Sequence, residues 1–141
     1  MATIFTRILD GELPGEFVWR DERCGVFLAL GPLRPGHALV VPIEEVDHWL
    51  DLSPDLVAHL FQVAQMIGEA QMAAFSPTRI GLIVAGLEVP HTHVHVIPIR
   101  DEADLDFANA SRDHDPQAMA EAAEAIRVAL RAAGRDEVAT A

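Results

Sequence analysis

The chain has 141 residues, of which 22 are acidic and 10 basic, and its formal net charge at pH 7 is −12. Apart from the 7 histidines, every basic residue is an arginine. The absence of lysine excludes Schiff-base chemistry and a lysine-dependent phosphate loop. The acidic balance argues against a nucleic-acid partner, because non-specific affinity for nucleic acid rests on neutralising phosphates. The length fits a single domain with a sizeable core.

The cysteine content and the N-terminal residues limit the class further. Cys24 is the single cysteine, which excludes an internal disulfide and a Cys-rich zinc site. Residues 1–7 lack the long apolar run of a signal peptide, so we expect a cytoplasmic protein. No stretch approaches the ~20 apolar residues needed to span a bilayer, and we expect no membrane partner.

Signals for one short helix and three strands fill the first forty residues. The apolar spacing predicts a helix over residues 4–9, which Gly11 and Pro14 end. Runs of β-branched and aromatic residues then predict strands at residues 17–20, 26–30 and 37–41.

A long helix, two strands and a last helix follow. Ser53 as N-cap and Pro54 at the first helical position begin the long helix, and Ser76 ends it. The remaining predicted segments are strands at 79–85 and 92–99, an acidic stretch at 101–115 and an amphipathic helix at 115–132. Neighbouring strands with short connections and a few helices indicate an antiparallel α+β domain.

Three histidines alternate with apolar residues in the last predicted strand. Because residues i, i+2 and i+4 of a strand share a face, His91, His93 and His95 would stand in a row, roughly 6–7 Å apart. Three buried imidazoles are hard to explain structurally, since charged ones repel and neutral ones need partners for both ring nitrogens. The row therefore indicates a functional site.

Two chemistries fit such a row. His-x-His on a strand presents two metal ligands, which a further histidine could complete into a zinc site. Alternatively, imidazoles can act as nucleophile and acid–base groups near neutral pH. The turn at Gly86 favours the second interpretation, because a glycine there lets backbone N–H groups approach a phosphate.

The sequence His91-Thr92-His93-Val94-His95-Val96 resembles the defining motif of the histidine triad (HIT) family. Further segments resemble its branch of histidine triad nucleotide-binding proteins, and the match runs from about Thr3 to Arg100. These segments are Thr3-Ile4-Phe5 with Ile8 and Leu13-Pro14, Arg23-Cys24 with Phe27, and Pro35-Gly36-His37 with Val40-Val41-Pro42.

The resemblance implies an α+β, HIT-like fold: a five-stranded antiparallel sheet with flanking helices, joined to a second copy across a homodimer. Residues 1–108 would form the HIT domain. Residues 109–141 would form a C-terminal extension whose helix packs on the same single domain. That extension would either contribute to specificity or dimer contacts, or be a solvated tail with a packing helix.

Site residues follow from the resemblance position by position. Family members cleave nucleotidyl groups at the α-phosphate through a covalent nucleotidyl-histidine, so His93 would be the nucleophile. His95 would act beside the phosphate as hydrogen-bond donor or proton source, and His91 would pair with His37. The phosphate turn would comprise Gly86, Leu87, Glu88 and Val89. An apolar pocket for the purine nucleotide would comprise Phe5, Ile8, Leu13, Phe27 and Leu30, for which plain core packing is the alternative.

Several positions depart from the family pattern. The ribose-binding carboxylate falls on Ala29, the phosphate-loop Asn falls near Ile80, and Leu87-Glu88 replaces a Gln-Ser pair. Zinc-binding relatives carry a Cys-x-x-Cys where this chain has Thr3 and Thr6. We therefore expect no metal, even with His48 present, and no cofactor.

Three functions remain after these comparisons of residues. The leading hypothesis is a nucleotidyl hydrolase or transferase acting on nucleoside phosphoramidates or related derivatives. The second is a nucleotide-binding sensor or partner module with little turnover, suggested by Ala29, Ile80 and Glu88. The third is a zinc-dependent hydrolase that uses the same histidines.

Overall fold

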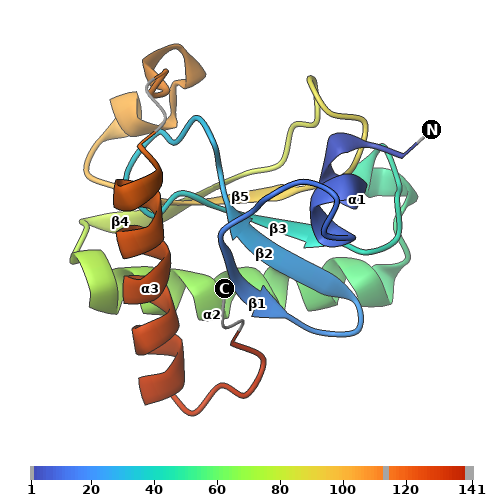
Figure 1. Cartoon of the computed structure of the whole chain (residues 1–141). Helices are drawn as coiled ribbons and strands as arrows, with labels where there is room; N and C mark the ends of the chain where they lie inside the picture. Colours follow the sequence, from blue (N-terminus) through green and yellow to red (C-terminus); the bar gives the residue numbers. More distant parts are fainter. Residues whose placement is uncertain (1, 113–114, 139–141) are drawn as a thin grey trace.

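The computed structural model describes residues 2–112 and 115–138, which form one sheet with helices on both of its faces (Figure 1). The five strands are antiparallel in the order β1-β2-β3-β5-β4. The helices are α1 (Ile4–Leu9), α2 (Pro54–Phe75) and α3 (Pro116–Ala132), with 3-10 helices η1 (Trp49–Asp51), η2 (Glu102–Leu105) and η3 (Phe107–Asn109). The strands are β1 (Phe17–Arg20), β2 (Cys24–Leu28), β3 (Ala38–Pro42), β4 (Arg79–Ile83) and β5 (Val94–Ile99). The predicted α+β class and five-stranded sheet are confirmed.

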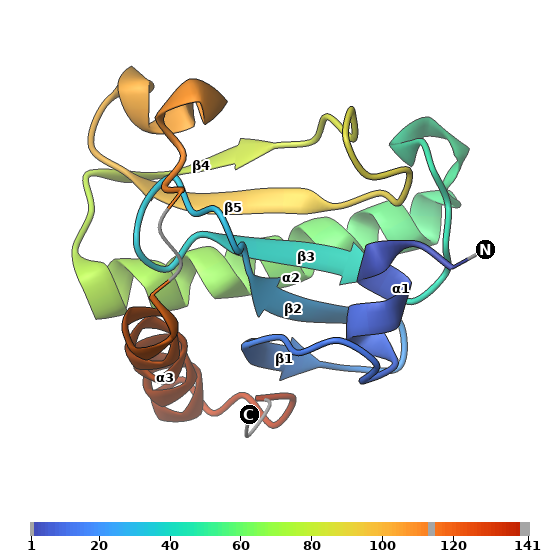
Figure 2. The ribbon, with the colours of Figure 1, turned by 45° about the horizontal axis from the view of Figure 1, so that its top comes forward.

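Alternation along the strands separates two faces of the sheet. Val26, Val40 and Val96 lie in the main core, which the long helices cover, whereas Phe27 and Leu39 lie in a smaller cluster beside α1. His95 pairs with Leu39 in the β3–β5 ladder and so shares the α1 face. In Figure 2, α1 stands in front of the sheet and α2 runs behind it. Helix thus covers only part of the sheet face that carries His95.

The long helices begin where their capping residues predict. The Ser53 side chain accepts a hydrogen bond from the Leu56 amide, and Pro54 opens α2. At the other end Ser76 adopts the left-handed conformation, with φ of 49°, which stops the helix. The Asp115 side chain caps α3 by accepting from the Gln117 and Ala118 amides.

The predicted strand over 92–99 begins late, at Val94. Thr92 donates from both its amide and its hydroxyl to the Val46 carbonyl, so the chain is fastened to the loop after β3. The His91 ring, rather than a backbone amide, reaches the Pro42 carbonyl at the end of β3. The alternating pattern was therefore wrong about the first two histidines of the row, which precede β5.

Helix α3 contributes to the main core. Ile126 and Leu130 are nearly inaccessible to solvent and belong to that core, and α3 packs on α2 and β1. Among the described residues, no helix combines the length and apolarity that crossing a membrane requires.

Candidate active site

His37 and His95 form a hydrogen-bonded pair with a defined direction. The Leu33 amide donates to His37 Nδ1 at 3.0 Å, so that nitrogen is an acceptor and His37 Nε2 carries the proton. His37 Nε2 lies 2.9 Å from His95 Nδ1, which must then accept. A neutral His95 consequently carries its proton on Nε2. The backbone turn at Leu33 thereby fixes His95 as a hydrogen-bond donor.

His93 has the opposite tautomer. Its Nδ1 lies 2.7 Å from the His91 carbonyl oxygen, which can only accept, so Nδ1 carries the proton. Neutral His93 therefore presents a lone pair on Nε2. The His93 and His95 ring centroids are 4.9 Å apart. One imidazole with a nucleophilic nitrogen thus lies beside another with an N–H donor.

His91 has other partners than the His37–His95 pair. It is inaccessible to solvent, its Nε2 donates to the Pro42 carbonyl at 2.8 Å, and Thr3 Oγ1 lies 2.7 Å from Nδ1. The expected pairing of His91 with His37 is therefore wrong: His37 pairs with His95. The tautomer of His93 is held by the backbone carbonyl of His91 rather than by its ring.

Burial keeps the paired imidazoles neutral. Loss of hydration, with a smaller contribution from His93, lowers the pKa of His37 to about 4. Burial and the neighbouring His37 and His93 lower the pKa of His95 to about 3. Burial also holds the pKa of His93 below its usual 6.5, although the bond to the His91 carbonyl and the charge of Glu88 oppose this shift.

The predicted phosphate turn lies beside His93. Gly86 has φ of +75°, which favours glycine, and Leu87 is 94% exposed. Glu88 is exposed, and its charge opposes the lowering of the His93 pKa. Val89 packs against the cluster beside α1, and its carbonyl accepts from the His91 amide. The turn is thus held by packing and a hydrogen bond at Val89 and is exposed to solvent at Leu87 and Glu88.

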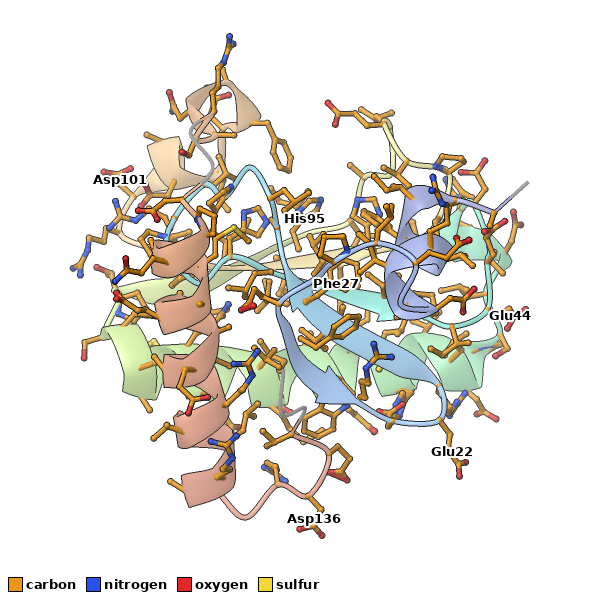
Figure 3. All side chains as sticks on the ribbon, in the orientation of Figure 1. Glu22, Phe27, Glu44, His95, Asp101 and Asp136 are labelled. Carbon is orange, nitrogen blue, oxygen red and sulfur yellow. The ribbon has the colours of Figure 1, made fainter. Side chains whose placement is uncertain are left out.

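An apolar wall lies on the other side of His93. Phe5 meets the His93 ring edge-on, with 4.8 Å between centroids, and Phe5, Ile8 and Phe27 are buried in one cluster with Leu13 at its margin. Figure 3 places Phe27 and His95 on the same face of the sheet. Leu30 is 55% exposed and outside this cluster. Its contact with a purine stays a prediction.

Two departures from the family pattern fall in different places. Ala29 is buried in the cluster beside α1 and lines a cavity of about 300 Å³ that His37 also lines. Ile80 packs toward α2 and lies against Gly68, on the opposite face from His95. The placement of the phosphate-loop position near Ile80 is therefore wrong, because alternation in β4 turns that residue away from the histidines.

The donors present do not fit a metal at the histidine row. Both His91 nitrogens, Nδ1 of His93 and both His37 nitrogens already have hydrogen-bond partners. Thr3 and Thr6, at the positions where the sequence resemblance implies cysteines in zinc-binding relatives, form a hydroxyl network in which Thr6 Oγ1 donates to Glu45. His48 accepts from the Leu50 amide.

Asp21, Cys24 and His59 form a separate cluster of potential ligands, whose ligand atoms lie within 4.8 Å of one another. Burial would raise the pKa of Asp21, but hydrogen bonds from Trp19, two backbone amides and His59 lower it to about 2. Burial raises the pKa of the Cys24 thiol. The carboxylate is thus already satisfied by N–H donors, which gives His59 a structural role.

Two residues of the site were missed by the sequence analysis. Gln71 is inaccessible in α2, and its Nε2 donates to the carbonyls of Gly36 and Val96, at 2.9 Å each. It fastens the turn before His37 to β5, and a polar residue in the apolar stripe of α2 was the available signal. Phe107 meets the His95 ring edge-on at 5.0 Å between centroids, and nothing in the acidic stretch indicated that contact.

Comparison with known proteins identifies the family of this chain. The HIT domain model matches residues 10–102. The chain is 30% identical to Adenylylsulfatase HINT3 of Arabidopsis thaliana over 134 residues, covering 91% of this chain and 68% of that protein. It is 36% identical over 92 residues to the asymmetrical bis(5'-nucleosyl)-tetraphosphatase of Schizosaccharomyces pombe, covering 62% of this chain and 50% of that protein.

A solved structure extends the similarity to almost the whole chain. The zinc-bound histidine triad family protein of Mycobacterium smegmatis superposes with a TM-score of 0.81 at 26% identity, covering 95% of this chain and 96% of that one. The motif, the fold and the extent of the family match agree, and this chain belongs to the histidine triad family.

Proposed function

We propose that this protein is a nucleotidyl hydrolase or transferase that cleaves nucleoside phosphoramidates or related nucleotidyl derivatives at the α-phosphate. The observation that carries the proposal is the pair of opposite tautomers: a lone pair on His93 Nε2 beside an N–H on His95 Nε2. A nucleophile next to a fixed hydrogen-bond donor suits displacement at phosphorus, where catalysis rests on positioning and charge stabilisation.

The proposed reaction has two displacements. His93 Nε2 attacks the α-phosphorus and forms a P–N bond, while the leaving group departs with the electrons of its bond to phosphorus and takes up a proton from solvent. Water then attacks the same phosphorus, the P–N bond breaks, and a nucleoside monophosphate and one proton are released. His95 donates a hydrogen bond to the phosphate, and covalent catalysis divides one difficult step into two easier ones.

The surrounding residues position these two groups. His37 and the Leu33 amide keep His95 a donor, and the His91 carbonyl keeps His93 Nε2 unprotonated. The wall of Phe5, Ile8 and Phe27 supplies apolar surface for a purine. The neutral imidazoles add no positive charge, so the backbone at Gly86 is the proposed source of further N–H donors to the phosphate.

The proposal is tested by steady-state assays on nucleoside phosphoramidates, acyl-adenylates and dinucleoside polyphosphates. We expect wild-type protein to cleave at least one class to a nucleoside monophosphate, and His93→Ala to lose that activity. His59→Ala is the matched control, since His59 bonds to Asp21 in the separate cluster, and it should retain activity. Equal turnover by wild type and His93→Ala would overturn the mechanism.

A nucleotide-binding module with little turnover is the second candidate, and Glu88 is the observation that favours it. Its negative charge acts on His93 and would oppose a phosphate there. Tight nucleotide binding by calorimetry, without cleavage of any substrate in the panel, would support this candidate over the hydrolase. Glu88→Gln should then raise nucleotide affinity.

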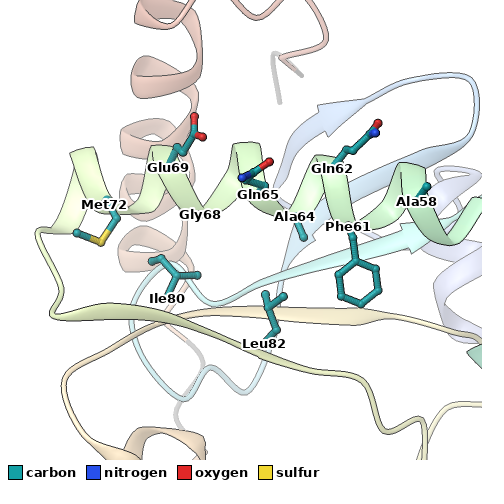
Figure 4. Close-up of a pocket in the computed structure, with 10 residues that line it drawn as sticks. All are labelled: Ala58, Phe61, Gln62, Ala64, Gln65, Gly68, Glu69, Met72, Ile80 and Leu82. Carbon is teal, nitrogen blue, oxygen red and sulfur yellow. The ribbon is translucent and has the colours of Figure 1, made fainter.

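We also propose that two copies pair through β4 and the neighbouring face of α2. β4 is an edge strand. Leu82 of β4 and, on α2, Phe61 and Met72 are each about 40% exposed along a mainly apolar groove (Figure 4). An edge strand flanked by apolar side chains is suited to strand addition. The proposal predicts that light scattering gives a mass of twice 15.3 kDa for the wild type. Leu82→Asp should reduce this to the monomer mass. Val128→Asp, on the exposed surface of α3, should not. A wild-type monomer would refute it.

A further inference from the structure

Phe107 extends the aromatic and imidazole rings of the site into one continuous row. Consecutive ring centroids lie 4.8 Å apart from Phe5 to His93, 4.9 Å from His93 to His95 and 5.0 Å from His95 to Phe107. The two histidines therefore have an aromatic ring on each side. Phe107 is 45% exposed, so much of its surface is available to a ligand.

The segment that carries Phe107 is fastened to the sheet. Leu105 lies against the backbone of Gly81 in β4, where an added Cβ would meet its Cδ2 at 2.9 Å. The Arg100 amide donates to Asp104, and η2 packs on β5. In Figure 2 this orange segment stands above β4 and β5, over the end of the sheet near the 29–37 loop.

A second fastening lies on the far side of Phe107. The Ser111 amide donates to the Pro32 carbonyl at 3.0 Å, in the turn whose Leu33 amide orients His37. Within η3, Asp106 caps the helix by accepting from the Ala108 amide, and Asn109 Nδ2 donates to the Ala103 carbonyl. Phe107 is thus held over His95 by contacts at both ends of its segment.

The order of the rings indicates toward which ring each substituent of a bound phosphate would point. A phosphate between His93 and His95 would have one substituent toward Phe5 and the other toward Phe107. The Phe5 side continues into the apolar cluster beside α1 with Ile8 and Phe27, which suits a nucleoside. In-line attack from His93 places the leaving group on the opposite side of phosphorus, which is the side of His95 and Phe107.

From this geometry, and resting on the proposed function, we infer that Phe107 is a specificity-determining residue that binds an aromatic leaving group. Its exposed ring offers the edge or face that aromatic partners prefer. Acidic residues of the same segment disfavour a polyanionic leaving group and tolerate a neutral or cationic amine. These residues are Asp101, Glu102, Asp104 and Asp106.

The test compares two non-cleavable adenosine phosphonate analogues, one with an aryl-ethyl group in the leaving position and one with a small alkyl group. Wild-type protein should bind the aryl analogue about tenfold more tightly. Phe107→Ala should remove that preference, Phe107→Leu should keep only part of it, and Val128→Ala on α3 should leave it unchanged. Calorimetry gives these affinities without requiring turnover.

Positioning is tested by Gly81→Ala, whose Cβ would displace Leu105 and should weaken the aryl preference while leaving affinity for the alkyl analogue within about twofold. Equal binding of both analogues by wild type, or a preference that survives Phe107→Ala, would overturn the inference. Failure of the proposed function has a different signature, because the substrate panel would then show no cleavage that depends on His93.

Discussion

At the scale of single residues, hydrogen-bond direction determines what each histidine can do. Alternation in the sequence correctly indicated that His95 lies on the face opposite the main core, because that residue belongs to a regular strand. It could not indicate the partners of His91, which are a carbonyl and a hydroxyl from distant segments. Nor could it indicate those of His37, which are the His95 ring and the amide of Leu33 in a non-regular turn. The motif thus indicated the proposed nucleophile, whereas tertiary contacts determine the tautomers.

Because the imidazoles of His37 and His95 are neutral, we expect kcat/KM to fall on the acid side only at unusually low pH. The pKa values of His37 and His95 are lowered to about 4 and about 3, so protonation of this pair should reduce kcat/KM only below about pH 5. The measurement is a kcat/KM profile from pH 4 to 8, on a substrate with no group that titrates in this range. An acid limb near 6.5, the ordinary histidine value, would contradict the buried neutral pair.

The same shifts predict a pH-dependent stability. The pKa of His37 falls from 6.5 when unfolded to about 4 when folded, so the unfolded state binds more protons between these values. The free energy of unfolding should therefore decrease as pH falls from about 6.5 to about 4. Urea unfolding at pH 7 and pH 4.5 measures this, and the decrease should be smaller in His37→Asn.

Thr3 links the cap of α1 to His91. Its hydroxyl accepts from the Thr6 amide and bonds to His91 Nδ1. Thr3→Val should lower the free energy of unfolding by about 2–4 kcal/mol, from the lost cap and from a buried His91 Nδ1 left with the longer contact to Thr6 Oγ1, at 3.4 Å. Thr3→Ser keeps the hydroxyl and should stay near wild type in urea unfolding. Thr6→Val, whose hydroxyl bonds mainly to exposed Glu45, should cost less than Thr3→Val; equal losses would refute the link.

At the scale of elements, capping residues predicted the helices better than alternation predicted strand ends. Ser53-Pro54 and Asp115-Pro116 mark the starts of α2 and α3 correctly, because an N-cap acts through its own local hydrogen bonds. Strand ends depend on contacts with other segments, since β3 continues to Pro42 beyond its last pair with β5. β5 begins at Val94 because that residue pairs with Val40, and Thr92 is bound to another loop.

Gln71 is the element-scale link between α2 and the site. Gln71→Leu leaves the carbonyls of Gly36 and Val96 without their side-chain donor, so it should destabilise the protein by about 1–3 kcal/mol. It should also reduce kcat, because the turn before His37 loses its tether to β5. Gln117→Leu, exposed at the start of α3 and away from the proposed dimer groove, should change stability by no more than about 0.5 kcal/mol. Urea unfolding and kcat measure both, and equal effects would argue against the tether.

At the scale of the whole molecule, the domain extends beyond the family match. The HIT match ends at residue 102, yet Met119, Ile126 and Leu130 complete the main core. The sequence predicted α3 from its cap and periodicity, but its packing partner depends on the surface that α2 and β1 leave open. We propose that residues 1–108 and the 109–141 extension form one cooperative unit.

This proposal predicts that α3 contributes to global stability. Ile126→Ala removes a fully buried side chain and should lower the free energy of unfolding by about 2–5 kcal/mol in a single transition. Val128→Ala, 54% exposed on the same helix, should have little effect. Two separate transitions by fluorescence and circular dichroism would show instead that the extension folds apart from the HIT domain.

The net charge of the chain must be distinguished from the charge at the site. The net charge of −12 argues against a basic nucleic-acid surface, yet a single phosphate needs only a local site. The described site consists of neutral imidazoles and a backbone turn, so its chemistry does not depend on the acidic surface. Glu88 is the exception, since its charge acts on His93.

The central claim is that His93 Nε2 is the nucleophile. It is tested most directly by quenching a reaction with α-³²P-labelled nucleotide within one turnover and locating the label by peptide mass spectrometry and nuclear magnetic resonance. His93→Asn is the matched variant, because its amide can still donate to the His91 carbonyl while Nε2 is lost. The account predicts a label on His93 Nε2 in wild type, and none in His93→Asn, with cleavage reduced on the order of a thousand-fold or more. A label on another residue, or undiminished cleavage by His93→Asn, would contradict it.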